Sequence, residues 1–258
     1  MLVKIVRILV SLALASAVAA CGGGGGGGGG GSGTVTQDLG DTAYWPFDSV
    51  AGNASPNTKF AGLDAVLNSA SLVPGRVGNA LQLDANLPQS YAEIPITPGG
   101  EIVVDFPGDD ISVALWARPT QIGATATYIL LGGGSGGQQS FHVRVVGGKV
   151  AFFLNKAPSI GTEDLIATST TALTTATWTH IAVTFDGTVA TIYLNGVVDA
   201  TVVMPHRVEQ VINRLYVGGR QLTTGTPDIF PGAIDELVLT QRVLTPAEIA
   251  QLVAGNPP

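Results

Sequence analysis

Ionisable side chains are scarce in this sequence, since Asp, Glu, Lys and Arg make up 12% of its 258 residues. Only 12 are basic and 19 are acidic, which gives a formal net charge of −7 at pH 7. A contiguous basic surface is hard to build from so few dispersed cations, so we expect no nucleic acid partner. The chain has one cysteine and therefore no internal disulfide, so its domain must be stable through its core or a metal.

Motifs of the common catalytic sites are also missing. The sequence has no G-x-S-x-G, no H-E-x-x-H and no phosphate-binding loop, and its three histidines lie in strand or loop patterns. Asp235 and Glu236 are adjacent in a strand pattern, where neighbouring side chains point to opposite faces. They are therefore not expected to act as a catalytic carboxylate pair, and no catalytic residue is predicted.

Residues 1–20 are predicted to be a signal peptide. Lys4 and Arg7 form a basic start, and residues 8–17 are apolar but shorter than the roughly 20 residues that span a bilayer. Small residues then precede Cys21. Removal of residues 1–20 takes away two basic residues and no acidic one, so the net charge changes from −7 to −9.

The four residues Val18-Ala19-Ala20-Cys21 resemble the lipobox of bacterial lipoproteins. The resemblance implies that Cys21 carries lipid after cleavage, whereas the alternative is a plain secreted protein in which Cys21 is incidental. Residues 21–40 would then be the acylated cysteine and a flexible glycine-rich tether. A glycine after the cysteine resembles lipoproteins sent to the outer membrane, so we expect an exported protein anchored to the cell envelope, at the outer membrane or cell surface.

Residues 41–258 have the pattern of an all-β domain. Residues 178–203 contain three β-rich segments separated by Asp186-Gly187 and Asn195-Gly196, which predicts an antiparallel meander. Gly147-Gly148 predicts a further hairpin within residues 141–155. About a dozen strand candidates are too many for one flat sheet and favour two packed sheets.

One short helix is predicted at residues 244–255. Thr245 is a good N-cap, Pro246 suits the first helical position, and Glu248 completes a capping box with Thr245. Gly255 is placed to end the helix.

Six segments in order are similar to the laminin G-like jelly roll of the concanavalin A-like lectin and glucanase superfamily. They are "AYWPFD" (43–48), "GRVGNALQLD" (75–84), "ISVALWARP" (111–119), "WTHIAVTFDGTVATIYLNG" (178–196), "RLYVGGR" (214–220) and "FPGAIDELVLTQRVLTPAEIAQL" (230–252). The resemblance implies a two-sheet antiparallel jelly-roll sandwich over residues 41–258, with its first and last strands close together.

The resemblance also implies one structural Ca²⁺ where the first and last strands meet. Asp48 and Asp235 stand at positions from which such domains draw ligands, and Asn53 could add a further oxygen. The alternative is that Asp48 caps a turn and Asp235 is a hydrogen-bonded strand residue. Such a metal would be structural and not catalytic.

The superfamily's usual non-enzymatic use implies a recognition module for a glycan or a protein. Trp45, Trp116 and Trp178 lie in strand patterns and are interpreted as core residues, which leaves few aromatic side chains for a sugar platform. No ligand-binding residue can be singled out, and the oligomeric state is left open. A structural or adhesin subunit of an envelope assembly and a glucanase-type hydrolase remain the alternatives.

Overall fold

The computed structural model describes residues 42–60, 62–95, 109–123, 127–133, 139–155, 163–206, 214–219 and 228–258. The predicted signal peptide, Cys21 and the glycine-rich segment lie outside these ranges. In the described residues, no helix is long and apolar enough to cross a membrane.

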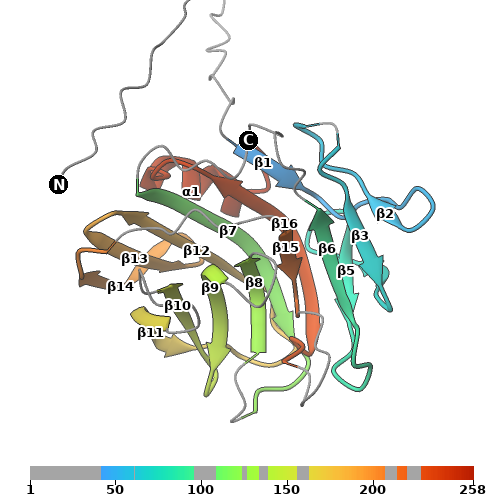
Figure 1. Ribbon diagram of the computed structural model, residues 1–258, viewed down its shortest axis with the longest axis horizontal. Coiled ribbons are helices and arrows are strands. Elements are labelled where there is room, and N and C mark those ends of the chain that lie inside the picture. The colour runs from blue at the N-terminus through green and yellow to red at the C-terminus, as the bar shows by residue number, and fades with distance from the viewer. Residues whose placement is uncertain are drawn as a thin grey trace, which may run out of the picture. The chain divides into compact units, whose positions relative to one another are not determined.

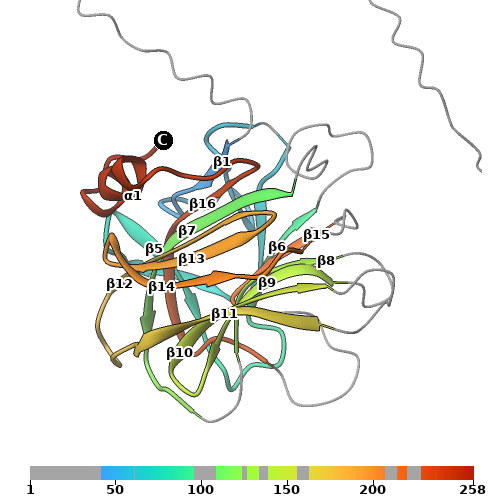
Figure 2. The same cartoon turned by 90° about the vertical axis from the view of Figure 1, so that its left-hand side faces the viewer.

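Two antiparallel sheets form the domain (Figures 1 and 2). Sheet A has the strand order β14-β13-β12-β7-β16-β5-β4, and β1 pairs with β16 beside this path. Its strands are β1 (Thr42–Trp45), β4 (Ser71–Pro74), β5 (Asn79–Leu83), β7 (Asp110–Pro119), β12 (Thr179–Asp186), β13 (Val189–Leu194), β14 (Val197–Val203) and β16 (Gly232–Thr240). The predicted all-β jelly-roll sandwich is thus confirmed.

Sheet B has the strand order β11-β10-β9-β8-β15-β6-β3-β2. Its strands are β2 (Ala54–Ser55), β3 (Ala65–Asn68), β6 (Tyr91–Pro95), β8 (Thr127–Gly133), β9 (Gln139–Val146), β10 (Lys149–Asn155), β11 (Glu163–Ala172) and β15 (Arg214–Val217). Four of these sixteen strands were not predicted from the sequence, because their segments are short or polar: β2, β3, β4 and β11.

The main core lies between the two sheets and is built by strand alternation. Ile181, Val183 and Phe185 of β12 point into it, as do Ile234 and Leu237 of β16. The opposite face of sheet A, which we call the outer face, is covered in part by a second small cluster that includes Tyr44, Ala114, Ala182 and Ile249.

The hairpin turns confirm most of the sequence prediction. Asn195 and Gly196 have φ values of 52° and 80°, and Gly147 and Gly148 have 57° and 83°. These positive values match the right-handed twist of the flanking strands. The predicted Asp186-Gly187 turn is shifted by one residue, because β12 ends at Asp186 and β13 begins at Val189, with Gly187 and Thr188 between them. The Asp186 carboxylate accepts the N–H groups of Thr188 at 2.9 Å and Val189 at 2.6 Å.

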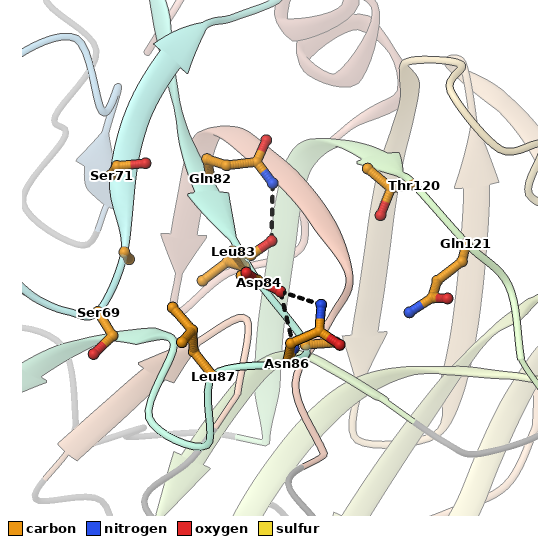
Figure 3. A pocket seen from close by; sticks show the side chains of 11 residues that line it. Ser69, Ser71, Gln82, Leu83, Asp84, Asn86, Leu87, Thr120 and Gln121 are labelled. Carbon is orange, nitrogen blue, oxygen red and sulfur yellow. Dashed lines mark hydrogen bonds between the residues drawn. The ribbon is translucent and has the colours of Figure 1, made fainter.

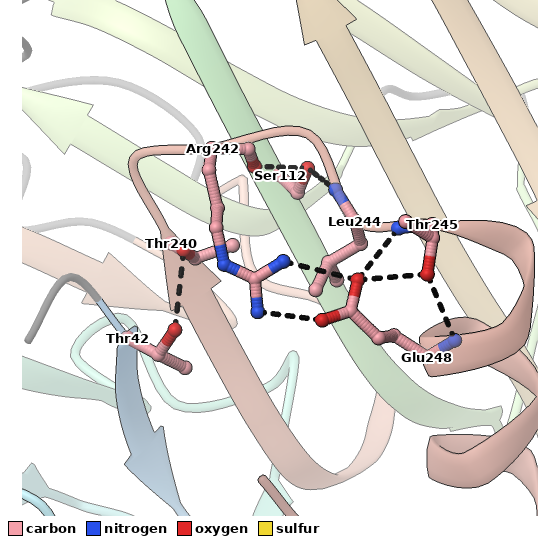
Figure 4. Close-up of polar contacts among 7 residues, drawn as sticks. All are labelled: Thr42, Ser112, Thr240, Arg242, Leu244, Thr245 and Glu248. Atoms are coloured by element: carbon pink, nitrogen blue, oxygen red, sulfur yellow. Dashed lines mark hydrogen bonds and ion pairs between the residues drawn. The ribbon is translucent and has the colours of Figure 1, made fainter. Parts of the chain in front are cut away.

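The first strand is held against the last one. Strand β1 pairs antiparallel with β16, with Thr42 opposite Thr240, and the two hydroxyls are 3.2 Å apart (Figure 4). This pairing confirms that the first and last strands of the domain lie together.

Helix α1 (Pro246–Val253) follows β16 and packs on the outer face of sheet A through buried Ile249. The predicted capping box of Thr245 and Glu248 is present. Arg242 also pairs with Glu248 at 2.8 Å, and Figure 4 shows both contacts on one carboxylate. The Ser112 hydroxyl of β7 binds the backbone on both sides of this connection, at Arg242 and Leu244.

Candidate functional site

The two predicted metal ligands Asp48 and Asp235 hold one backbone turn, residues 75–79, which connects β4 to β5. Asp235 Oδ2 accepts the N–H groups of Arg76 at 2.7 Å and Val77 at 3.1 Å. Asp48 Oδ1 accepts the N–H of Asn79 at 2.9 Å. Both carboxylates therefore serve as acceptors for backbone groups that would otherwise lack a partner.

Two glycines allow the carboxylates to approach this turn. A Cβ on Gly78, whose φ is +52°, would lie 1.8 Å from Asp48 Oδ1. A Cβ on Gly75 would lie 2.5 Å from Asp235 Oδ2. Any side chain at either position would displace a carboxylate from the turn.

Asp235 and Glu236 do not alternate as the sequence predicted. The register of β16 against β7 shifts between Asp235 and Val238, and Glu236 has a φ of 55°. This bulge turns Glu236 toward Tyr44, whose hydroxyl donates to Glu236 Oε2 at 2.7 Å. Both carboxyl groups consequently lie on the outer side of the sheet, and the expectation of opposite faces was wrong.

Burial raises the pKa values of Asp235, Glu236 and Tyr44. Burial, followed by the charge of Glu236, raises the pKa of Asp235 to about 7 against the stabilising N–H donors of the turn. Burial and the charge of Asp48 raise the pKa of Glu236, although its bond from Tyr44 opposes the shift. The phenol pKa of Tyr44 is raised by burial and by its hydrogen bond to Glu236.

The structure brings together two of the three predicted calcium ligands. Asn53 lies apart from the 75–79 turn, in the segment before β2, and its carbonyl accepts the N–H of Leu67 at 2.8 Å. Within the described ranges, no group of three or more His, Cys, Asp or Glu side chains is arranged to hold a metal. Asp235 Oδ1 and Glu236 Oε1 are buried with no hydrogen-bond partner there, yet two such oxygens fall far short of the six to eight that Ca²⁺ prefers. The predicted ligand set therefore does not fit Ca²⁺ as it stands.

A groove of about 540 Å³ lies at the other end of β4 and β5 (Figure 3). Four segments line it: the β3–β4 turn, the end of β5, the loop after β5 and the residues after β7. The lining residues are Ser69, Ala70, Ser71, Gln82, Leu83, Asp84, Ala85, Asn86, Leu87, Thr120 and Gln121. Six of these eleven residues carry an amide or a hydroxyl, four are Ala or Leu, and Asp84 is the one charged residue of this lining.

Internal hydrogen bonds fix the walls of the groove. The buried Ser90 hydroxyl donates to the Ser69 carbonyl at 3.0 Å and accepts the Asp84 N–H at 2.9 Å. Asp84 Oδ1 in turn accepts both nitrogens of Asn86, at 2.9 and 2.8 Å. The groove is thus largely formed before any ligand arrives, which lowers the entropic cost of binding.

Exposed polar groups remain on these walls. Asn86, Thr120 and Gln121 are exposed. Thr120 is held by its own hydroxyl donating to the Pro231 carbonyl at 3.0 Å, so the adjoining Gln121 amide stands on an anchored segment. Amide groups that both donate and accept suit a ligand rich in hydroxyl groups.

The aromatic residues divide differently from the sequence prediction. Trp45 is fully buried in the main core, as predicted, but Trp116 is buried on the outer face. Trp178 is only half-buried and packs on Arg118, so its interpretation as a core residue was wrong. Among the loop aromatics, Phe230 is buried in the core, whereas Phe106 lies outside the described residues.

Comparison with known proteins gives one family and several structural relatives. The laminin G-like family model of the "Concanavalin A-like lectin/glucanases superfamily" matches residues 89–250. No curated protein matches the sequence.

Domain 4 of an extracellular arabinanase from Geobacillus stearothermophilus, solved with arabinotriose, is similar in structure. It shows a TM-score of 0.58 and 22% identity, over 83% of this chain and 99% of that one. Trypanosoma rangeli sialidase shows a TM-score of 0.62 and 16% identity, over 84% of this chain and 33% of the sialidase. The binding domain of a paraclostridial mosquitocidal protein shows a TM-score of 0.61 and 12% identity, over 83% of this chain and 52% of that one. These similarities support the fold, and the matched family model shows that the chain belongs to the concanavalin A-like lectin/glucanases superfamily.

Proposed function

We propose that this chain is an exported, lipid-anchored recognition module that binds a glycan in the groove beside β4 and β5. The observation that carries the proposal is the groove itself, whose anchored walls present amide and hydroxyl groups. Sugar hydroxyls form paired donor and acceptor contacts with such groups. The arabinotriose held by the similar arabinanase domain supports a sugar ligand for a domain of this fold.

We propose a non-catalytic role because the adjacent carboxyl groups are placed for folding. Glycoside hydrolysis needs two carboxyl groups that face the sugar from a groove. Asp235 and Glu236 are 0% and 9% exposed, and their oxygens bind the 75–79 turn and Tyr44. These contacts and this low exposure leave neither carboxyl group open to a polysaccharide.

A glycan array probed with the detergent-solubilised full chain tests the binding proposal. We expect a defined set of oligosaccharides to bind, and Gln121→Ala to weaken each of them. The matched control is Gln251→Ala, which removes the same amide from an exposed position on α1. Absence of all sugar binding would reject the glycan ligand in favour of a protein partner.

The lipid anchor rests on the lipobox-like sequence and is tested separately. Cells fed labelled palmitate should incorporate label into the wild-type chain and should not label Cys21→Ser. Labelling of both chains, or of neither, would reject acylation at Cys21 and favour a plain secreted protein.

Calcium dependence stays a prediction of the family resemblance. If Ca²⁺ ties the first and last strands together, EDTA should lower the melting temperature and added Ca²⁺ should restore it. Asp48→Asn should remove the difference between the two conditions. An unchanged melting temperature in EDTA would leave the 75–79 turn held by Asp48 and Asp235 alone.

A further inference from the structure

A row of side chains crosses the outer face of sheet A next to the groove. Strand register places Ser71 of β4 opposite Gln82 of β5, Gln82 opposite Ala233 of β16, and Ala233 opposite Arg118 of β7. Their chain neighbours Leu81, Ala117 and Ile234 face the main core, so the row faces outward. Ser71 and Gln82 also line the groove, so the row leads from the groove to Arg118, with buried Ala233 between them.

Trp178 ends this row. It precedes Thr179, which pairs with Ala117, and the Arg118 guanidinium carbon lies 4.8 Å from the centre of its ring. A second pair of the same kind lies alongside, with Arg76 over Trp116 at 4.7 Å. Trp116 is two residues from Arg118 on the same face of β7, a spacing of about 7 Å.

These two arginines differ from others in the described part of the chain. Arg214 pairs with Glu93 and Arg242 pairs with Glu248. Arg76 and Arg118 stack on tryptophan, and neither has a carboxylate partner among the described residues. A guanidinium stacked through its flat face keeps its N–H edge for an acidic group.

The chain's negative net charge does not oppose a short-range contact of this kind. At physiological ionic strength, charges separated by more than about 8 Å are largely screened. An acid bound directly by Arg118 is therefore governed by that contact more than by the 19 acidic residues of the sequence. Asp84, the charged residue of the groove lining, lies beyond the end of β5, on the far side of β16 from Arg118.

We propose that the groove binds an acidic oligosaccharide, whose carboxylate or sulfate groups contact Arg118 and Arg76 while a sugar ring packs against Trp178. This inference rests on the proposed glycan-binding function and names the ligand class of the same site. A polymer with an acidic group on successive units can reach both arginines, because Arg76 stacks on Trp116, which is two residues from Arg118 on the same face of β7.

Calorimetric titration of the detergent-solubilised full chain tests this. The probes are an oligogalacturonate, its fully methyl-esterified form, and a sulfated neutral oligosaccharide of the same length. We expect the uronate or the sulfated probe to bind about tenfold more tightly than the ester, as one charged hydrogen-bonded contact would give. Tighter binding of the oligogalacturonate would identify the acidic group as a carboxylate, and tighter binding of the sulfated probe would identify it as a sulfate.

Arg118→Gln should abolish this preference, so that the acidic probes bind no more tightly than the ester. Arg118→Lys should keep only part of the preference, because lysine lacks the planar fork. Arg144→Gln is the matched control, since Arg144 stacks on Phe153 of sheet B at 5.0 Å. Melting curves of all three variants establish that they fold.

Equal affinity for the acidic probes and the ester would overturn this inference. So would loss of the preference in Arg144→Gln and its retention in Arg118→Gln. If the ester still binds and Gln121→Ala weakens it, the glycan-binding function stands without the acidic ligand. Failure of every array sugar and of all three probes would reject both proposals.

Discussion

Polar side chains at one end of β4 and β5 stabilise the fold, whereas those at the other end are exposed in the groove. At one end, Asp48 and Asp235 direct their oxygens at the N–H groups of the 75–79 turn. At the other end, Asn86 and Gln121 stand exposed on walls that Ser90 holds in place. The carboxylates that stand out most in the sequence therefore serve the fold, and plain amides form the candidate binding surface.

This comparison predicts that changes to the carboxylates and glycines that hold the 75–79 turn lower stability and that changes to the groove amides lower binding. Variants of the turn are measured by urea unfolding, and the groove variant is measured by calorimetric titration and a melting curve.

The largest expected effect is a pH dependence of stability that arises from Asp235. Its carboxyl pKa is about 7 in the folded protein and about 4 in an unfolded chain, so the folded state binds more protons between these values. Stability should fall by up to about 4 kcal/mol as pH rises from 4 to 7. Urea unfolding of wild type and Asp235→Asn, compared at each pH, isolates this contribution.

His180 titrates in the opposite sense and must be separated from Asp235. Burial lowers the pKa of His180 to about 4, so its contribution is present above the ordinary value and is lost as pH falls through about 4. The difference between wild type and Asp235→Asn cancels it. A pH-independent difference would contradict the raised pKa of Asp235.

Asp235→Ala should cost about 3 kcal/mol of unfolding free energy, because it leaves the N–H groups of Arg76 and Val77 without their acceptor. Asp186→Ala is the control, since it removes a carboxylate that also accepts two N–H groups but in an exposed turn. The measurement is urea unfolding at constant pH. Equal losses in the two variants would contradict the role given to burial.

Gly78→Ala should cost about 2 kcal/mol, because the added Cβ meets Asp48 Oδ1 and the backbone has a positive φ. Gly52→Ala is the matched control, since Gly52 also has a positive φ but no atom within 4 Å of its built Cβ. The excess loss at Gly78 measures the contact with Asp48. No excess would mean that Asp48 leaves the turn readily.

Gln121→Ala should weaken glycan binding about tenfold, the upper end of the effect of one lost neutral hydrogen bond, with an unchanged melting temperature. The residue is exposed, so the fold loses no core contact. Calorimetric titration and a melting curve of the same sample are the two readouts. A lowered melting temperature with unchanged affinity would show that Gln121 serves the fold and not binding.

Thr245→Ala should cost about 1 kcal/mol through loss of the N-cap bond to Glu248. The Arg242 contact holds the pKa of Glu248 near 2, so that ion pair should persist in the variant at neutral pH. Urea unfolding of this variant provides the measurement, and glycan affinity should not change. A loss several times larger would show that helix α1 is needed for sheet A to form.

Local chemistry made part of this structure predictable. The Asn195-Gly196 turn and the capping box at Thr245 depend on neighbouring residues, and both formed as predicted. The bulge at Glu236 was missed because adjacent β-residues ordinarily alternate, and nothing in the local sequence signals an extra residue.

The groove could not be predicted from the sequence for a different reason. Its walls come from four segments separated along the chain, so no local spacing of residues describes it. Trp178 was misplaced because it stands immediately before β12, where alternation no longer determines burial. Sequence reasoning thus recovered the layers and hairpins, and the positions where segments meet required the structure.

The place of β16 in sheet A also determines when folding can finish. This strand arises near the end of the chain, yet it pairs with β7, β5 and β1. A growing polypeptide lacks the strand that joins these three until almost all of it has been made. Such long-range pairing slows folding, so sheet A cannot be completed until residues 232–240 have been synthesised.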